Sequence, residues 1–172
     1  MTSPITLGRQ SVWQAIESWS RLRESGQSVF KRLIKFEDEQ TPRLQDVVQS
    51  LGPGDLPAIA IFSRSINVSW KHTRTHHWLL DLDIKIWTPR WNLLLAEKYA
   101  PEVINAAHAA APADNPTVTF VKNPTTGTGY DPDGVPAIQF DPVSLGPDQA
   151  TRAIQTTIIL RLLFDFEPFA AA

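Results

Sequence analysis

The stretch HHWLLDLDIKIW, residues 76–87, decides the fold because its side chains alternate with a period of two, as in a β-strand. One face of this strand carries apolar side chains that we expect in the core: Trp78, Leu80, Leu82, Ile84 and Ile86. The other face carries a mixed row: His77, Leu79, Asp81, Asp83, Lys85 and Trp87. The sequence therefore predicts a central strand with a sharply defined register and a charged outer face, which meets solvent or a neighbouring subunit.

Further strand patterns lie on both sides of this stretch. Residues 56–70 form a strand pattern, and the polar segment 71–75 joins it to the central strand as an antiparallel hairpin. Residues 150–168 predict a long strand because β-branched and aromatic residues alternate along them. A mixed period-two pattern predicts a further strand within 28–39.

Helical spacing of apolar residues predicts three helices. An amphipathic helix covers 7–24, and a short helix lies within 41–55. Thr88 and Pro89 have the pattern of a helix N-cap and first turn, and the helix behind them runs to about residue 111, with Pro101 kinking or splitting it. The region 111–148 is rich in proline and glycine and reads as a loop insertion, in which 117–122 and 136–140 suggest a small hairpin.

This order of elements predicts an α+β fold. We expect an antiparallel sheet of about four strands with helices packed on one face, plus the loop-rich insertion, in one domain over 1–172.

The composition narrows the function classes. The 172 residues include 16 basic and 18 acidic ones, and a net charge of -2 disfavours nucleic acid as the main partner. The absence of cysteine excludes disulfides, thiol nucleophiles and thiolate metal sites, so the chain can fold in a reducing cytoplasm. No apolar run approaches the roughly 20 residues of a membrane span, and the N-terminal residues lack a signal-peptide pattern. We expect a soluble protein without a membrane partner.

The carboxylates of the central strand are weak candidates for chemistry. Asp81 and Asp83 lie on one side of the strand about 7 Å apart, with His77 in the same row, and such groups share a metal or a proton in some enzymes. The other interpretation is an outer face in which Lys85 relieves the repulsion between the two carboxylates. The sequence contains no recognisable catalytic or phosphate-binding motif, and the calcium-loop-like start at Asp131 lacks its glutamate because Pro142 stands there. We therefore expect no cofactor, and a ligand role for His77 stays open.

Aromatic and charged residues near the ends of the predicted strands are candidates for an interface. Basic residues at 64, 71, 74 and 90 lie near tryptophans in the sequence and would suit a phosphate backbone if they formed one patch. Exposed aromatic residues at such ends are also typical of protein interfaces. The full set of interface candidates is Trp70, Lys71, Arg74, Asp81, Asp83, Lys85, Trp87, Trp91 and Tyr130.

The element order resembles the tail terminator and head–tail joining proteins of long-tailed bacteriophages, also described as neck or tail completion proteins. The segments that carry the resemblance are SVWQAIESWSRL (11–22), LPAIAIF (56–62), WLLDLDIKIW (78–87) and TTIILRLLFDF (156–166). The resemblance implies a virion protein, assembled in the host cytoplasm, that forms a ring, commonly a hexamer. Its partners would be the tail tube protein and the head–tail connector, with a passing contact with DNA, and the family implies no catalytic residues. The alternatives are a metal-dependent hydrolase using His77, Asp81 and Asp83, or a nucleic-acid-binding accessory module.

Overall fold

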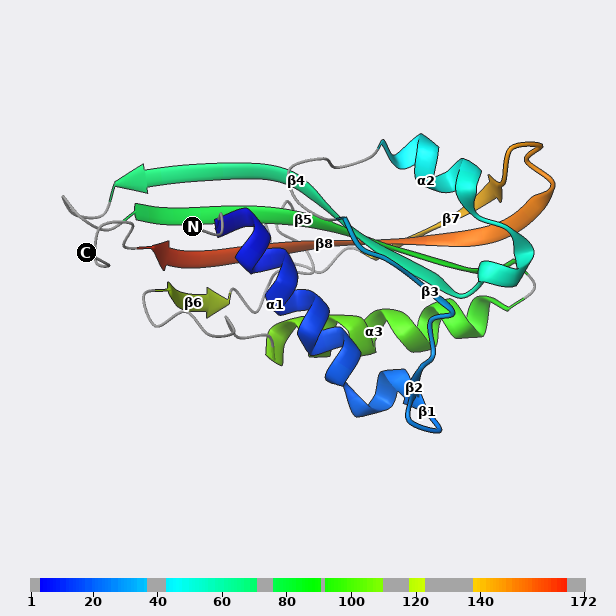
Figure 1. Cartoon of the computed structure of the whole chain (residues 1–172), viewed down its shortest axis with the longest axis horizontal. Helices are drawn as coiled ribbons and strands as arrows, with labels where there is room; N and C mark the ends of the chain where they lie inside the picture. The colour runs from blue at the N-terminus through cyan, green and yellow to red at the C-terminus, as the bar shows by residue number, and fades with distance from the viewer. Residues whose placement is uncertain are drawn as a thin grey trace.

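The computed structural model describes residues 4–36, 43–70, 76–90, 92–109, 118–122 and 138–166. Within them one mixed sheet has the strand order β3-β4-β5-β8-β6, and β7 also pairs with β8 (Figure 1). The strands of this sheet are β3 (Arg32–Ile34), β4 (Ala58–Trp70), β5 (His76–Pro89), β6 (Val118–Lys122), β7 (Ile138–Leu145) and β8 (Thr151–Phe166). Only β3 and β4 are parallel, and the other pairs are antiparallel. The predicted α+β class is confirmed.

The long strands follow the sequence patterns closely. The predicted hairpin is confirmed, with β4 and β5 in register from Ala58 opposite Trp87 to Trp70 opposite His76. β8 is the predicted long strand and lies on the other side of β5. In the strand predicted within 28–39, the described residues as far as 36 form β3, which follows a separate small ribbon of β1 (Arg23–Glu24) and β2 (Gln27–Ser28).

The predicted small hairpin inside the insertion is wrong. Its two strands, β6 and β7, pair with β8 and not with each other: β6 with residues 162–166 and β7 with residues 151–158. Because β8 is long, its outer edge accommodates both strands, one at each end. The expectation of loop as far as residue 148 is also wrong, since β7 is a regular strand that carries Pro142 on the edge of the sheet, where proline is tolerated.

A bulge at Arg64 keeps the apolar side of β4 in phase with its neighbour. Ser63 lies opposite Leu82 but Ser65 lies opposite Asp81, so Arg64 is an extra residue in β4. Before the bulge the buried positions Ile59 and Ile61 are odd-numbered, and after it Ile66 packs on the same core. Without the extra residue, Ile66 would lie on the opposite face, because a shift of one residue inverts a strand.

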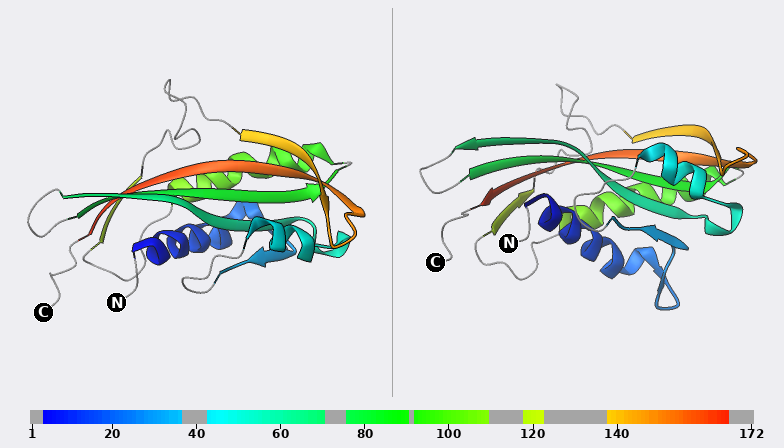
Figure 2. Two further views of the ribbon diagram at one scale, coloured as in Figure 1. Left: turned by 90° about the horizontal axis from the view of Figure 1, so that it is seen from above. Right: turned by 45° about the horizontal axis from the view of Figure 1, so that its top comes forward.

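Two long helices cover one face of the sheet. They are α1 (Pro4–Ser18), which the 3-10 turn η1 (Ser20–Leu22) follows, and α3 (Leu93–Ala109). In the right-hand view of Figure 2 they lie below the strands β4, β5 and β8, which run along the molecule as one twisted layer. The core between these layers includes Val12, Trp13 and Ile16 of α1, Tyr99, Val103 and Ala107 of α3, and Ile59, Ile61, Leu82, Ile84, Ile158 and Leu160 of the sheet.

The start of α3 differs from the prediction. Thr88 and Pro89 are the last residues of β5, so they do not cap the helix. The side-chain oxygen of Asn92 instead accepts a hydrogen bond from the backbone N–H of Leu95 at 3.2 Å, which is the geometry of a helix N-cap. The helix continues through Pro101 without being split.

The short helix α2 (Leu44–Ser50) and the 3-10 turn η2 (Pro53–Asp55) cover one end of the opposite face. A second core forms there from Val47, Leu51, Leu56, Ala58, Ala60, Phe62, Trp87, Leu145 and Ala153. The two long helices thus lie on one face, as predicted, and α2 gives the other face a smaller core of its own.

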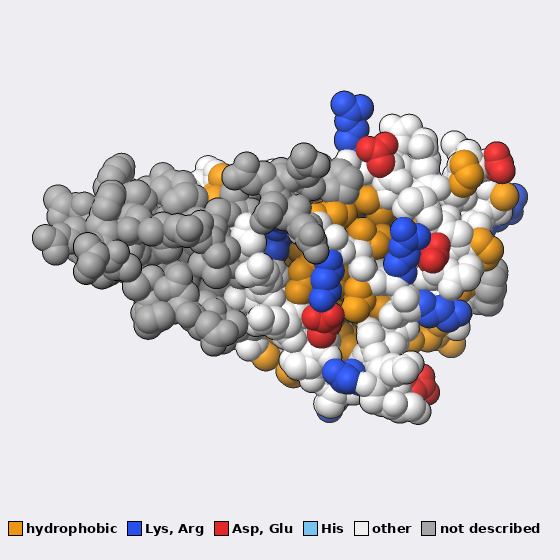
Figure 3. Space-filling view, in the orientation of Figure 1, with side chains coloured by type: hydrophobic (Ala, Val, Ile, Leu, Met, Phe, Trp, Pro, Cys, Tyr) orange, Lys and Arg blue, Asp and Glu red, His pale blue; other side chains and the backbone are white. Residues whose placement is uncertain are grey.

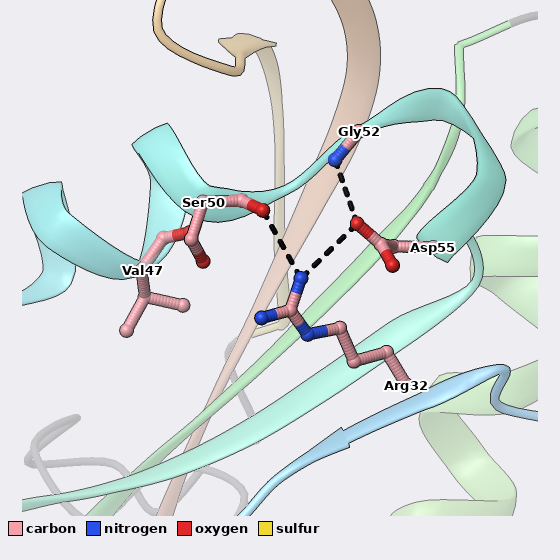
Figure 4. A network of polar contacts seen from close by, with 5 residues as sticks. All are labelled: Arg32, Val47, Ser50, Gly52 and Asp55. Carbon is pink, nitrogen blue, oxygen red and sulfur yellow. Dashed lines mark hydrogen bonds and ion pairs between the residues drawn. The ribbon is translucent and has the colours of Figure 1, made fainter.

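An arginine of β3 holds α2 and η2 in place (Figure 4). The Nη1 atom of Arg32 donates hydrogen bonds to the carbonyl oxygen of Ser50 at 3.0 Å and to Oδ2 of Asp55 at 3.1 Å. The same carboxylate oxygen accepts the backbone N–H of Gly52 at 2.8 Å. One side chain therefore joins β3 to the end of α2 and to the η2 turn.

Candidate functional site

The polar row of β5, which includes Asp81, Asp83 and Lys85, lies on the same face of the sheet as the second core. Asp81, the first carboxylate of this row, is buried. Asp81 is 1% exposed, and Ser65 Oγ donates a hydrogen bond to its Oδ2 at 2.7 Å. The bulge in β4 places Ser65 opposite Asp81. The expectation that Asp81 faces solvent is therefore wrong: its side chain is buried and accepts a hydrogen bond from Ser65.

Asp83 and the bulged residue form an ion pair at the surface. Arg64 Nη1 lies 3.4 Å from Asp83 Oδ1, and the two side chains are 46% and 22% exposed. At this distance and exposure, an ion pair contributes about 0.2–1 kcal/mol. The described structure thus gives both predicted carboxylates protein partners.

Lys85 is partly buried and hydrogen-bonded across the sheet. Its Nζ atom donates to Oγ1 of Thr157 on β8 at 2.8 Å. Burial lowers the pKa of Lys85 below its ordinary value of 10.5, while the charges of Asp83 and Asp141 act in the opposite direction. This lysine is part of a polar layer of the sheet and not a freely solvated charge.

Trp87 is a core residue, which corrects its prediction as an exposed interface residue. It is 0% exposed, and its Nε1–H donates to Oε1 of Gln155 at 3.0 Å. The alternation placed it on the polar face, but α2 and β7 cover that face at this end of the sheet. The residue opposite Trp87 on β4 is Ala58, which is small enough to leave space for an indole ring, and Ala153 of β8 belongs to the same core.

The remaining sequence candidates lie outside the described part. The backbone of Trp70 ends β4 opposite His76, but its side chain and the side chain of His77 are not described. The other candidates there are Lys71, Arg74, Trp91 and Tyr130. Among the residues that the structure does describe, no group of three or more histidine, aspartate or glutamate side chains is placed to hold a metal ion.

On the face shown in Figure 3, several charges of the described surface lie close to opposite charges. In the space-filling view basic and acidic side chains are interspersed (Figure 3). Ion pairs such as Arg21 with Glu102 at 3.2 Å and Lys35 with Glu17 at 2.6 Å join separate elements. The described part of this face therefore lacks the large basic patch that a nucleic-acid backbone favours.

The outer edge of β4 is mostly open in the described structure. β3 pairs with β4 only through Ala58, Ile59 and Ala60. From Ile61 to Trp70 no described strand pairs with this edge, although β5 pairs with the other edge throughout. An open edge presents backbone N–H and C=O groups that are free to pair with another chain.

A groove lies at the end of the molecule where β5 finishes and β8 begins. It has a volume of about 780 Å³ and is lined by Pro53, Leu56, Arg90, Ala150, Thr151 and Arg152. Its only charged lining residues in the described chain are the two arginines, both exposed. Sequence reasoning named Arg90 but missed the groove, because its lining comes from three segments that no local pattern connects.

No protein-family model matches the sequence, and no curated protein matches it either. Among the described helices, none is both long and apolar enough to cross a membrane.

Proposed function

We propose that this protein is a structural virion protein that forms a ring at the head-proximal end of a long-tailed phage tail. In this role it caps the tail tube and joins it to the head connector. The observation that carries the proposal is the outer edge of β4, with which, in the part of the chain that the structure describes, β3 pairs only through Ala58, Ile59 and Ala60.

The open part of the edge is long enough to contribute to an interface. From Ile61 to Trp70 it extends about 30 Å at the usual rise of a strand. The bulge at Arg64 interrupts regular pairing, which leaves the part from Ile66 onward as the regular stretch. Monomeric proteins usually protect such an edge, and subunits that assemble use it for pairing.

A contact between this edge and a different surface of the next subunit is heterologous. Heterologous contacts that close on rotation generate rings. The resemblance of the sequence to tail terminator and neck proteins supports the same assembly. The proposed partners are other copies of the chain, the tail tube protein and the connector.

Electron microscopy of the purified chain, alone and mixed with its tail tube protein, tests the proposal. We expect closed rings, and rings at one end of the tubes. A chain that stays monomeric at high concentration and beside the tube protein would contradict it.

A pair of matched variants tests the edge. Asn67→Lys adds a charge to an exposed position of β4, and lysine on an edge opposes strand addition. Asn105→Lys adds the same charge to an exposed position of α3. We expect the first variant to weaken ring formation and the second to leave it unchanged. If both variants form rings like those of the unmodified chain, the edge is not the contact.

A further inference from the structure

The groove beside Arg90 and Arg152 is a preformed feature with unused positive charge. In the described structure neither arginine side chain takes part in a hydrogen bond or ion pair, whereas several other surface arginines do. The rest of the lining is mainly apolar, with Pro53 and Leu56 on one side and Ala150 on the other. Guanidinium groups at the margin of an apolar groove suit a ligand that carries both a carboxylate and an apolar side chain.

The walls of the groove are held by interactions already described. The Arg32 and Asp55 contact fixes the η2 turn, which carries Pro53 and precedes Leu56 (Figure 4). On the other side, the N–H of Gly146 donates to the carbonyl oxygen of Val48 at 3.0 Å, which ties the β7–β8 turn to α2. Gly146 has φ +87°, a conformation in which a side chain is strained. Contacts within the chain therefore hold both walls of the groove.

Two features favour a peptide over a nucleic-acid backbone as the ligand. Phosphate binding strengthens with the number of basic groups, and this groove offers two. Its apolar walls would gain nothing from a phosphate, but they would bury an aromatic or aliphatic side chain.

The chain itself contains a segment of this chemistry directly after β8. Residues 167–169 are Glu167, Pro168 and Phe169, an acid and an aromatic residue separated by a proline that favours an extended backbone. The chain's acidic run at 37–39 has no apolar residue within it. The segment after β8 is therefore the better complement to the groove.

The geometry of β8 excludes this segment from the groove of its own subunit. Thr151 and Arg152, at the start of β8, line the groove, and the segment follows Phe166 at the far end of the strand. The two ends of β8 are about 50 Å apart at the usual rise per residue. Three residues reach about 10 Å. Residues 167–169 can thus reach the groove of a second copy of the chain but not the groove of their own copy.

We propose that the Arg90 and Arg152 groove binds residues 167–169 of a neighbouring copy, with Glu167 paired to the arginines and Phe169 buried in the groove. This contact joins opposite ends of two subunits and is heterologous, as a ring requires. It rests on the proposed self-assembly and names one of its contacts.

Sedimentation velocity of charge variants tests this contact. R90E/R152E and E167K should each weaken association at least tenfold, and combining R152E with E167K should recover part of it. K31E/R43E is the control, because it makes the same charge change at two exposed basic residues outside the groove. Circular dichroism checks that each variant is folded. Association of R90E/R152E equal to that of the unmodified chain would overturn the proposal and leave the ring intact.

A peptide experiment separates this inference from the proposed function. An amidated peptide of residues 165–172, which adds no terminal carboxylate, should bind the chain, and R90E/R152E should reduce that binding at least tenfold. F169S in the peptide should reduce it as well. If the chain is monomeric but binds the peptide in this way, the ring fails and the groove assignment stands. A DNA duplex serves as a second probe. If the peptide does not bind, or if R90E/R152E abolishes binding of the DNA duplex but leaves binding of the peptide unchanged, the groove assignment is wrong.

Discussion

Replacing Trp87 tests whether the second face of the sheet is a true core. The indole is 0% exposed and packs among Leu56, Ala58, Leu145 and Ala153. Trp87→Ala removes this ring from a close-packed site and leaves a cavity, and such truncations cost about 3–5 kcal/mol. The total stability of a domain is about 5–15 kcal/mol, so the loss takes between about a fifth and all of it.

The hydrogen bond of Trp87 is measured separately by a double-mutant cycle. Trp87→Phe keeps an aromatic ring but loses the donor to Gln155, and Gln155→Ala removes the acceptor. The coupling free energy between the two changes should be about 0.5–1.5 kcal/mol, the usual net contribution of such a bond.

The assay is urea unfolding followed by far-ultraviolet circular dichroism at a fixed, low protein concentration, since self-association raises apparent stability. The control is Leu94→Ala at a residue that is 76% exposed, and we expect it to change stability by less than about 0.5 kcal/mol. If Trp87→Ala unfolds within about 1 kcal/mol of the unmodified chain with the same urea dependence, Trp87 is not a core residue and the interface interpretation returns.

Three further predictions concern charged groups. Burial lowers the pKa of Lys85, so the unfolded chain holds the Lys85 proton more tightly than the folded chain does. The free energy of unfolding, relative to that of Lys85→Met, should therefore rise with pH between the lowered pKa and 10.5. Urea unfolding at a series of pH values measures this difference, and parallel pH profiles of the two proteins would contradict the assignment. The hydrogen bond from Trp19 lowers the pKa of Glu102 below 4.5. The unmodified chain should therefore lose stability as the pH falls from 4.5 through the lowered pKa of Glu102, and Glu102→Gln should not show this loss. Asp55→Ala should lower the free energy of unfolding by about 1–2 kcal/mol, because the ion pair with Arg32 and the acceptor for the backbone N–H of Gly52 are lost together. The control is Asp148→Ala, which removes an exposed carboxylate. Equal losses in the two variants would show that the Asp55 contacts do not hold the η2 turn.

The sequence predicts the long strands and the opening helix well because each has a strong periodic pattern of its own. Alternation over 76–87 places Leu82 and Ile84 in the core, and both are fully buried. The same alternation fails for Trp87, since one strand's pattern does not tell which elements cover its second face. The amphipathic pattern of 44–51 does require a surface to pack on, and that surface is the one around Trp87.

Other features depend on contacts between distant residues. The extra residue Arg64 is identified only by pairing β4 with β5, because its own sequence neighbourhood of serines has no distinctive pattern. β6 and β7 show strand propensity, but their partner is chosen by the length of β8. The end groove is assembled from segments around Pro53, Arg90 and Arg152, so its two arginines become a site only in the folded chain.

The mass of the purified chain in solution, measured by sedimentation velocity over a wide range of concentrations, tests the central proposal most directly. We expect one closed oligomer of defined copy number, and the resemblance to tail terminator proteins implies six copies. A single species at the mass of one 19.2 kDa chain across the whole range would contradict the proposed ring.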